Sequence, residues 1–122
     1  MKGVEYLEQI EDTEVRENIR EITRVFVDKI KPLKVILFGS FAKGSYTDDS
    51  DFDFYLVVED GRNIVGTTQD AYRATAFVKK RPVDIVVGSD SRFELKRFAA
   101  YSQMIEREVE DHGILLYDLS EV

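Results

Sequence analysis

Three short apolar runs, at residues 35–38, 52–58 and 83–87, constrain the fold of this chain more than any other feature. The first run stops at Gly39 and the third follows Pro82. Short continuous apolar runs with such boundaries are typical of strands that are covered on both faces. The sequence therefore predicts a sheet with helices packed against both of its sides.

A helical pattern precedes the first run. Between residues 12 and 31, apolar side chains recur every three or four positions, as on one face of a helix: Val15, Ile19, Ile22, Phe26 and Ile30. Asp12 or Thr13 can cap the start of this helix. Pro32 disfavours helical geometry at Lys31 and ends it. Residues 4–10 form either a separate short helix or an extension.

Two further helices and a last strand are expected in the second half of the chain. Residues 67–80 have helical composition, with Thr67 as the cap. Ser91 and Glu94 form a capping box that opens a helix ending near Gly113. One stripe of that helix is apolar: Leu95, Phe98, Ile105 and Val109. Its aromatic residues are expected in the core or on a partner surface: Phe93, Phe98 and Tyr101.

The order of these elements predicts the fold class. Residues 114–117 add a short strand after the last helix. Strands and helices that alternate in this way favour an α/β (α+β) fold, with helices packed on a mixed sheet of about three to five strands. A chain of 122 residues without repeats or linkers is expected to form one domain over residues 1–122.

The charge and composition exclude several functions. The net charge of −7 disfavours general nucleic-acid binding, which needs a basic face. The chain has no Cys, so it has neither a disulfide framework nor a thiolate zinc site. Its apolar runs are far shorter than the ~18 residues that a membrane span requires. We therefore expect a cytoplasmic protein that does not contact a membrane.

Three aspartates are placed for metal chemistry. Asp51 and Asp53 share one face of the second predicted strand, because side chains alternate along a strand. Their α-carbons are then about 6.5–7 Å apart, within reach of one divalent cation or of two neighbouring cations. Asp84 is the lone carboxylate of the third run, and it converges with them if the two strands are neighbours. Hard oxygen ligands of this kind suit Mg²⁺. Asp48 and Asp49, in contrast, fit a solvated acidic turn.

Gly39 and Ser40 supply a site for phosphate. A glycine after a strand lets the backbone approach a ligand closely. Ser40 is then expected at the start of a short helical turn that Gly44 can end. Free N–H groups at such a start favour a phosphate. A phosphate cradle beside carboxylates that hold a metal is the equipment for phosphoryl or nucleotidyl transfer.

At these residues the chain resembles the minimal nucleotidyltransferases of the DNA polymerase β-like superfamily. Their signature is Gly-Ser, ten residues, Asp-x-Asp, and a third Asp on a later strand, and this chain fits it. The resemblance implies a polymerase β-like fold that uses Mg²⁺ and a nucleoside triphosphate, usually ATP. It further implies that Gly39-Ser40 hold the triphosphate and that Asp51 and Asp53 bind metal. Asp84 binds metal or helps activate the attacking hydroxyl. Lys43, a candidate phosphate contact, stands where many relatives have Arg.

The resemblance extends to a biological role. Stand-alone chains of this size look like the antitoxins of HEPN/MNT toxin–antitoxin pairs. Those antitoxins transfer AMP from ATP to a tyrosine of a partner HEPN toxin and so silence it. The resemblance therefore implies a HEPN-domain protein as partner, and a homo-oligomer is also possible.

Two other functions remain open at this point. The chain could mask its HEPN partner stoichiometrically without catalysis. Alternatively, it could transfer a nucleotide to a small molecule or to an RNA end, which the acidic charge makes less favourable. The intact set of three aspartates favours catalysis over masking.

Overall fold

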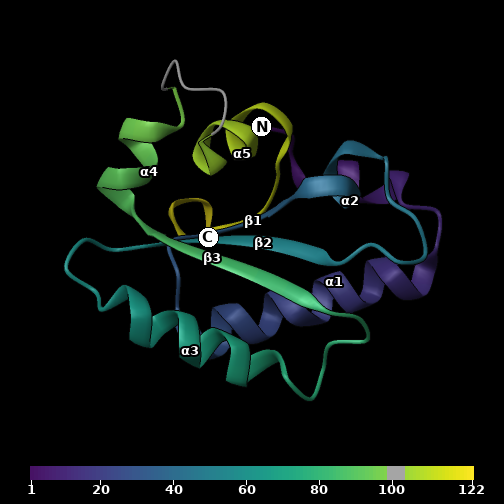
Figure 1. Cartoon of the computed structure of the whole chain (residues 1–122), viewed down its shortest axis with the longest axis horizontal. Helices are drawn as coiled ribbons and strands as arrows, with labels where there is room; N and C mark the ends of the chain where they lie inside the picture. Colours follow the sequence, from purple (N-terminus) through teal and green to yellow (C-terminus); the bar gives the residue numbers. More distant parts are fainter. Residues whose placement is uncertain (99–103) are drawn as a thin grey trace.

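A four-stranded sheet forms the centre of the computed structural model, which describes residues 1–98 and 104–122 (Figure 1). The strand order is β3-β2-β1-β4. β1 is antiparallel to both β2 and β4, whereas β2 and β3 are parallel. The strands are β1 (Lys34–Phe38), β2 (Phe52–Val58), β3 (Val83–Ser89) and β4 (Ile114–Asp118). The predicted mixed sheet and its strands are confirmed, and the third extends two residues further.

One face of the sheet carries the larger apolar core. It is covered by η1 (Val4–Gln9), α1 (Thr13–Val25), the π-helical turn η2 (Phe26–Ile30) and α3 (Ile64–Thr75). Phe26 of η2 packs edge-on against Phe54 of β2, with ring centroids 5.2 Å apart. Both are fully buried, so this face is closed to solvent at its centre.

The opposite face carries a smaller core beneath α4 (Asp90–Lys96) and α5 (Ile105–His112). Phe93 and Val109 bring these helices onto the sheet residues Ile36, Tyr55 and Val57. Figure 1 shows α4 and α5 on one side of the strands, with α1 and α3 on the other. The short helices α2 (Gly39–Lys43) and η3 (Leu119–Glu121) complete the described elements.

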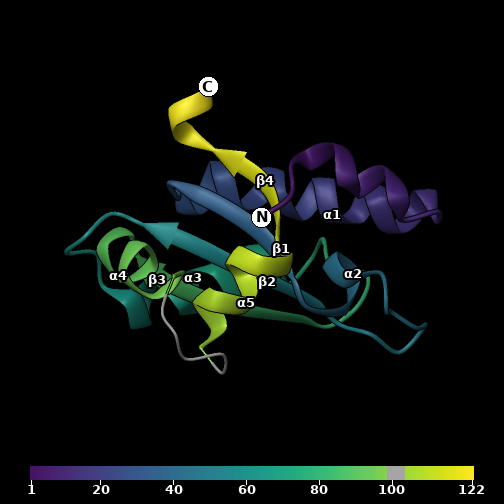
Figure 2. The same cartoon turned by 90° about the horizontal axis from the view of Figure 1, so that it is seen from above.

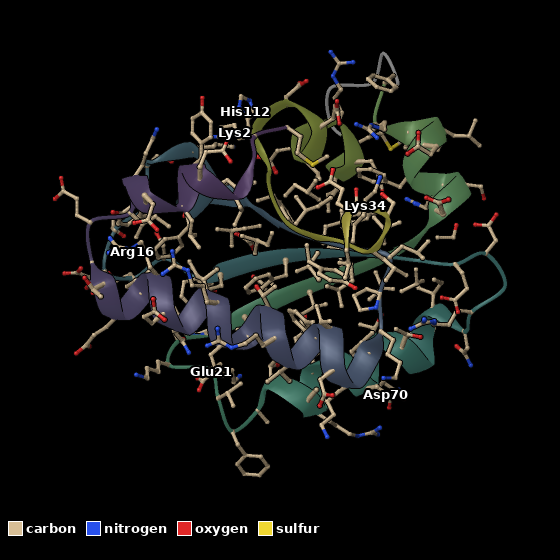
Figure 3. The ribbon with its side chains drawn as sticks, turned by 180° about the vertical axis from the view of Figure 1, so that it is seen from behind. Lys2, Arg16, Glu21, Lys34, Asp70 and His112 are labelled. Carbon is tan, nitrogen blue, oxygen red and sulfur yellow. The ribbon has the colours of Figure 1, made fainter. Side chains whose placement is uncertain are left out.

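The N-terminal segment lies beside β4, as the view from above shows (Figure 2). Lys2 forms an isolated bridge to Ile114, and its amide donates to the Gly113 carbonyl at 2.7 Å. Figure 3 accordingly shows Lys2 close to His112, at the end of α5. In the described part of the chain, no helix combines the length and apolarity needed to cross a membrane.

The first helix follows its prediction. Asp12 caps it by accepting hydrogen bonds from the amides of Glu14 and Val15. The helical run ends at Lys31, which adopts φ 54° immediately before Pro32. Of the two alternatives for residues 4–10, a separate short helix or an extension, the structure shows the first: η1, a 3-10 helix.

The predicted start of the second helix at Thr67 is wrong. The Asn63 side chain accepts from the Gly66 amide at 2.9 Å, so α3 begins at Ile64 and Thr67 is buried inside it. The helix ends at Thr75, five residues before the predicted end.

The predicted capping box and the single helix from Ser91 to near Gly113 are also wrong. Ser89 is the cap of α4, since its hydroxyl accepts from the Arg92 amide at 3.3 Å. α4 ends at Lys96, and α5 is a separate helix. The expected apolar stripe does not form, because Leu95 and Phe98 are 75% and 65% exposed. Tyr101 lies outside the described residues.

Candidate active site

Gly39 brings the turn after β1 directly against Asp53. Phe38, the last residue of β1, is the register partner of Asp53 on β2. Gly39 has φ +72°, and a Cβ added there would lie 2.1 Å from Asp53 Oδ2. Any side chain would therefore clash with the carboxylate as well as strain the backbone. Glycine is required here for the approach to Asp53, a contact that the sequence alone did not indicate.

Ser40 lies at the beginning of α2, as predicted. Among the described residues, no side chain caps the amides at this end of the helix. At the other end, Gly44 adopts φ +80° and its amide donates to the Ser40 carbonyl. Ser40 and the start of α2 thus lie at the same end of the strands as Asp53.

The structure brings Asp53 and Asp84 together. They are register partners on the parallel strands β2 and β3. Their face is the one that α4 and α5 cover, because the neighbouring residue of the same face, Tyr55, belongs to that core. Asp84 is exposed, whereas Asp51, one residue before β2, and Asp53 are half-buried.

Among the described residues, the three aspartates do not form a complete set of metal ligands. In residues 1–98 and 104–122, no group of three or more acidic or histidine side chains is close enough together to hold a metal ion. The predicted convergence is thus present for Asp53 and Asp84, which are register partners, and the charge of Asp51 also acts on Asp53.

The electrostatics of the site centre on Asp53. Burial, together with the nearby charges of Asp84, Asp51 and Glu108, raises the pKa of this carboxyl to about 6, while Lys43 acts in the opposite direction. Gathered like charges of this kind are costly unless a cation accompanies them. The donor set, carboxylate oxygens with an adjoining serine turn, fits a hard divalent cation such as Mg²⁺.

Lys43 and Glu108 form an ion pair at the rim of this site. The Lys43 ammonium nitrogen at the end of α2 lies 2.5 Å from Glu108 Oε1 on α5. Glu108 is a fourth carboxylate near Asp53 that sequence reasoning missed. Its partner is far away in sequence, so no local signal could have identified it.

A buried polar network lies behind the aspartates. The Tyr55 hydroxyl donates to Glu106 Oε2 at 2.7 Å, and Arg92 Nε donates to the same oxygen at 3.2 Å. Burial acts to raise the pKa of Glu106, but the hydrogen bonds from Tyr55, from the Glu106 backbone and from Arg92, with the charge of Arg92, outweigh it, so the pKa is lowered. Glu106 is 2% exposed, and among the described residues its Oε1 atom has no hydrogen-bond partner. Tyr55 itself lies in the smaller core. A signal for Glu106 existed, because it lies three positions before the buried Val109.

Comparison with known families shows to which family the chain belongs. The family described as "Nucleotidyltransferase domain" matches residues 19–116, most of the chain. The chain belongs to the nucleotidyltransferase domain family. The resemblance inferred from Gly39-Ser40 and the aspartates is thereby confirmed at the level of the family.

Two curated relatives of this nucleotidyltransferase domain come from Methanocaldococcus jannaschii. Both carry the provisional name protein adenylyltransferase. MJ0604 is 38% identical over 47 residues, which are 38% of this chain and 45% of the relative. MJ1379 is 36% identical over 44 residues, 36% of this chain and 44% of the relative. The chain thus spans less than half the length of the curated relatives that it matches.

Solved structures share the fold of this nucleotidyltransferase domain. A mutant of the toxin–antitoxin MntA-HpeT superposes with a TM-score of 0.58 at 22% identity, covering 84% of this chain and 74% of that chain. A toxin–antitoxin with AMP-PNP gives a TM-score of 0.55 at 21% identity with the same coverage. The predicted α/β fold, with helices packed on a mixed sheet, is thus confirmed and matches that of these neighbours.

Proposed function

We propose that this nucleotidyltransferase domain, over residues 1–122, transfers AMP from ATP to a tyrosine hydroxyl of a HEPN-type toxin and so acts as its antitoxin. The observation that carries the proposal is the contact of the Gly39-Ser40 turn with Asp53, beside the register partner Asp84. The turn after β1 and two carboxylates lie at the same end of the strands, which supports a role of the turn in binding phosphate beside them. The toxin–antitoxin neighbours and the curated relatives support the choice of a protein acceptor.

The residues divide the work by position. Ser40 and the amides at the start of α2 bind the triphosphate, and Lys43 adds a positive charge at the end of the same helix. Asp51 and Asp53, together with Asp84, would hold one or two Mg²⁺ ions, which neutralise phosphate charge when bound. Asp84 is exposed and accepts the proton of the acceptor hydroxyl. The acceptor oxygen then attacks the α-phosphorus and pyrophosphate leaves. Positioning and electrostatics supply most of the rate gain.

The charge of the molecule supports a basic protein partner. The net charge of −7 is complementary to an enzyme that binds and cuts RNA, which needs positive charge. Such a pair would operate in the cytoplasm.

Transfer of an α-phosphate label tests the proposal. The domain is incubated with α-labelled ATP, Mg²⁺ and the protein encoded next to it. We expect label on that protein, and loss of the label with Asp53→Asn. Asp48→Asn is the matched control, because Asp48 is an exposed aspartate of the loop before β2 and should keep full transfer.

Three results would contradict the proposal. Label transfer that survives Asp53→Asn would refute the role of that carboxylate. Neutralisation of the toxin by an Asp51→Asn/Asp53→Asn double variant would favour stoichiometric masking. Label appearing on an RNA end or on a small molecule would identify a different acceptor.

A further inference from the structure

The Lys43–Glu108 ion pair links the phosphate-binding turn to α5. The two side chains are 40% and 32% exposed, so the pair lies at the rim of the site rather than in the core. Lys43 follows Ser40 by three positions on α2, and residues with this spacing share a helix face. The ammonium group that could meet a triphosphate is therefore already in contact with a carboxylate.

Glu108 is held in place by the helix that carries it. Two residues earlier, Glu106 accepts the buried hydrogen bond from Tyr55, and one residue later, Val109 is fully buried against the sheet. α5 cannot move away from α2 without breaking these contacts. The flexible member of the pair is thus Lys43, whose long side chain can reorient about several bonds.

Negative charges surround the Lys43–Glu108 pair and disfavour the binding of an anionic ligand. Asp53 lies near Asp51, Asp84 and Glu108, and Lys43 is the cation that acts against them. When a triphosphate binds at the Ser40 turn, the Lys43 ammonium group is already paired with Glu108. An ion pair of this exposure is weak enough for a polyanion to displace its carboxylate.

We propose that Glu108 is a positioning residue for Lys43: it holds the ammonium group in the free protein and yields it to the triphosphate. This inference rests on the proposed nucleotide transfer, because it needs a triphosphate at the Gly39-Ser40 turn. Binding of the nucleotide then breaks the Lys43–Glu108 ion pair between α2 and α5. Because this ion pair must be broken, Glu108 lowers the affinity for the nucleotide.

Nucleotide affinity tests this competition. The probe is an ATP analogue with a non-hydrolysable α,β-linkage, titrated with Mg²⁺ into the whole chain. Glu108→Gln is expected to bind it about two- to fivefold more tightly than the wild type, the range given by an exposed ion pair. Glu110→Gln is the matched control. Glu110 carries the same charge on the same helix, but pairs with Arg97 at 2.6 Å.

A second variant separates competition for Lys43 from simple repulsion. Glu108→Asp keeps the charge but is too short to maintain the 2.5 Å contact. We expect it also to bind more tightly than the wild type, and the KM for ATP to fall in both variants. Wild-type affinity in Glu108→Asp, with a gain in Glu108→Gln, would show repulsion alone and overturn the inference. Equal gains in Glu108→Gln and Glu110→Gln would overturn it too.

The two proposals fail in different ways. A wild-type chain that binds no nucleotide overturns the proposed function and, with it, this inference. A wild-type chain that binds the analogue, with Glu108 variants no tighter, overturns the role of Glu108 alone. Thermal unfolding of each variant verifies that the compared proteins are folded.

Discussion

Gly39 combines a left-handed backbone conformation with close surroundings. Its φ of +72° lies in the left-handed region, and a Cβ would approach Asp53 Oδ2 to 2.1 Å. Gly44 shares the positive φ, at +80°, but a Cβ there would meet no atom within 4 Å. Substitutions at Gly39 and at Gly44 therefore separate the effect of backbone strain from the effect of a clash with the Asp53 carboxylate.

Gly39→Ala is expected to cost about 1–3 kcal/mol of unfolding free energy and to abolish nucleotide transfer, because Asp53 must move. Gly44→Ala should show the backbone strain alone and retain transfer. Urea denaturation and the α-phosphate label measure the two effects. Normal transfer by Gly39→Ala would show that the close contact does not position Asp53.

The candidate site residues were predictable because they are local in sequence. Gly39-Ser40 directly follow β1 and Asp51-Phe52-Asp53 stand at the start of β2, and alternation alone assigns the aspartates to one face. The pairing of Asp84 with Asp53 could be predicted only on the condition that their two strands are neighbours, which the sequence did not establish. Lys43–Glu108 and Tyr55–Glu106 could not be predicted, since each joins elements whose distance in space is set by the tertiary fold.

At the scale of elements, α5 is attached to the sheet through a carboxylate as well as through apolar packing. Glu106 is buried and accepts hydrogen bonds from Tyr55 and Arg92. A Cβ at Gly88 would lie 2.0 Å from the Tyr55 hydroxyl oxygen, so β3 must have glycine to leave room for this bond. The network fixes the helix that carries Glu108.

This attachment should weaken in acid. The pKa of Glu106 is lowered in the folded protein, so its ionised form stabilises the fold above the ordinary glutamate value. That contribution is lost as the pH falls below about 4.3 towards the lowered native value. Glu106→Gln is expected to lose about 1–3 kcal/mol at pH 7, and its deficit should shrink as the solution is acidified.

Denaturation of wild type and Glu106→Gln at several pH values measures this difference. Tyr55→Phe, which removes one donor to the carboxylate, should give an intermediate pH dependence. A deficit that stays constant from pH 7 to pH 3 would show that the lowered pKa does not contribute to stability.

Element boundaries were the least predictable part of the fold. Asn63 and Ser89 cap α3 and α4, although Thr67 and Ser91 offered equally good local sequences. Which residue caps each of these helices depends on where the preceding strand ends. The division between α4 and α5 was hidden because Leu95 and Phe98 continue the spacing of an apolar stripe, yet both side chains are exposed.

At the scale of the molecule, the family match and the apolar core do not coincide. The nucleotidyltransferase match covers residues 19–116, whereas Leu7 and Ile10, which precede it, are 0% and 2% exposed in the main core. Helices on two faces of a mixed sheet were predictable from the continuous apolar strands. The contribution of η1 to that core was not, because residues 4–10 carry no extended periodicity.

The parallel pairing of β2 with β3 determines when the candidate site residues Asp53 and Asp84 can come together during folding. Asp53 and Asp84 are separated in sequence by the whole of α3, and they become neighbours when that crossover has docked. Pairing of distant segments is slower than local helix formation. Refolding from denaturant should therefore restore the far-ultraviolet helix signal before nucleotide transfer, and simultaneous recovery would contradict this order. A nascent chain in which β3, which ends at Ser89, has not yet emerged from the ribosome would therefore lack nucleotide-transfer activity.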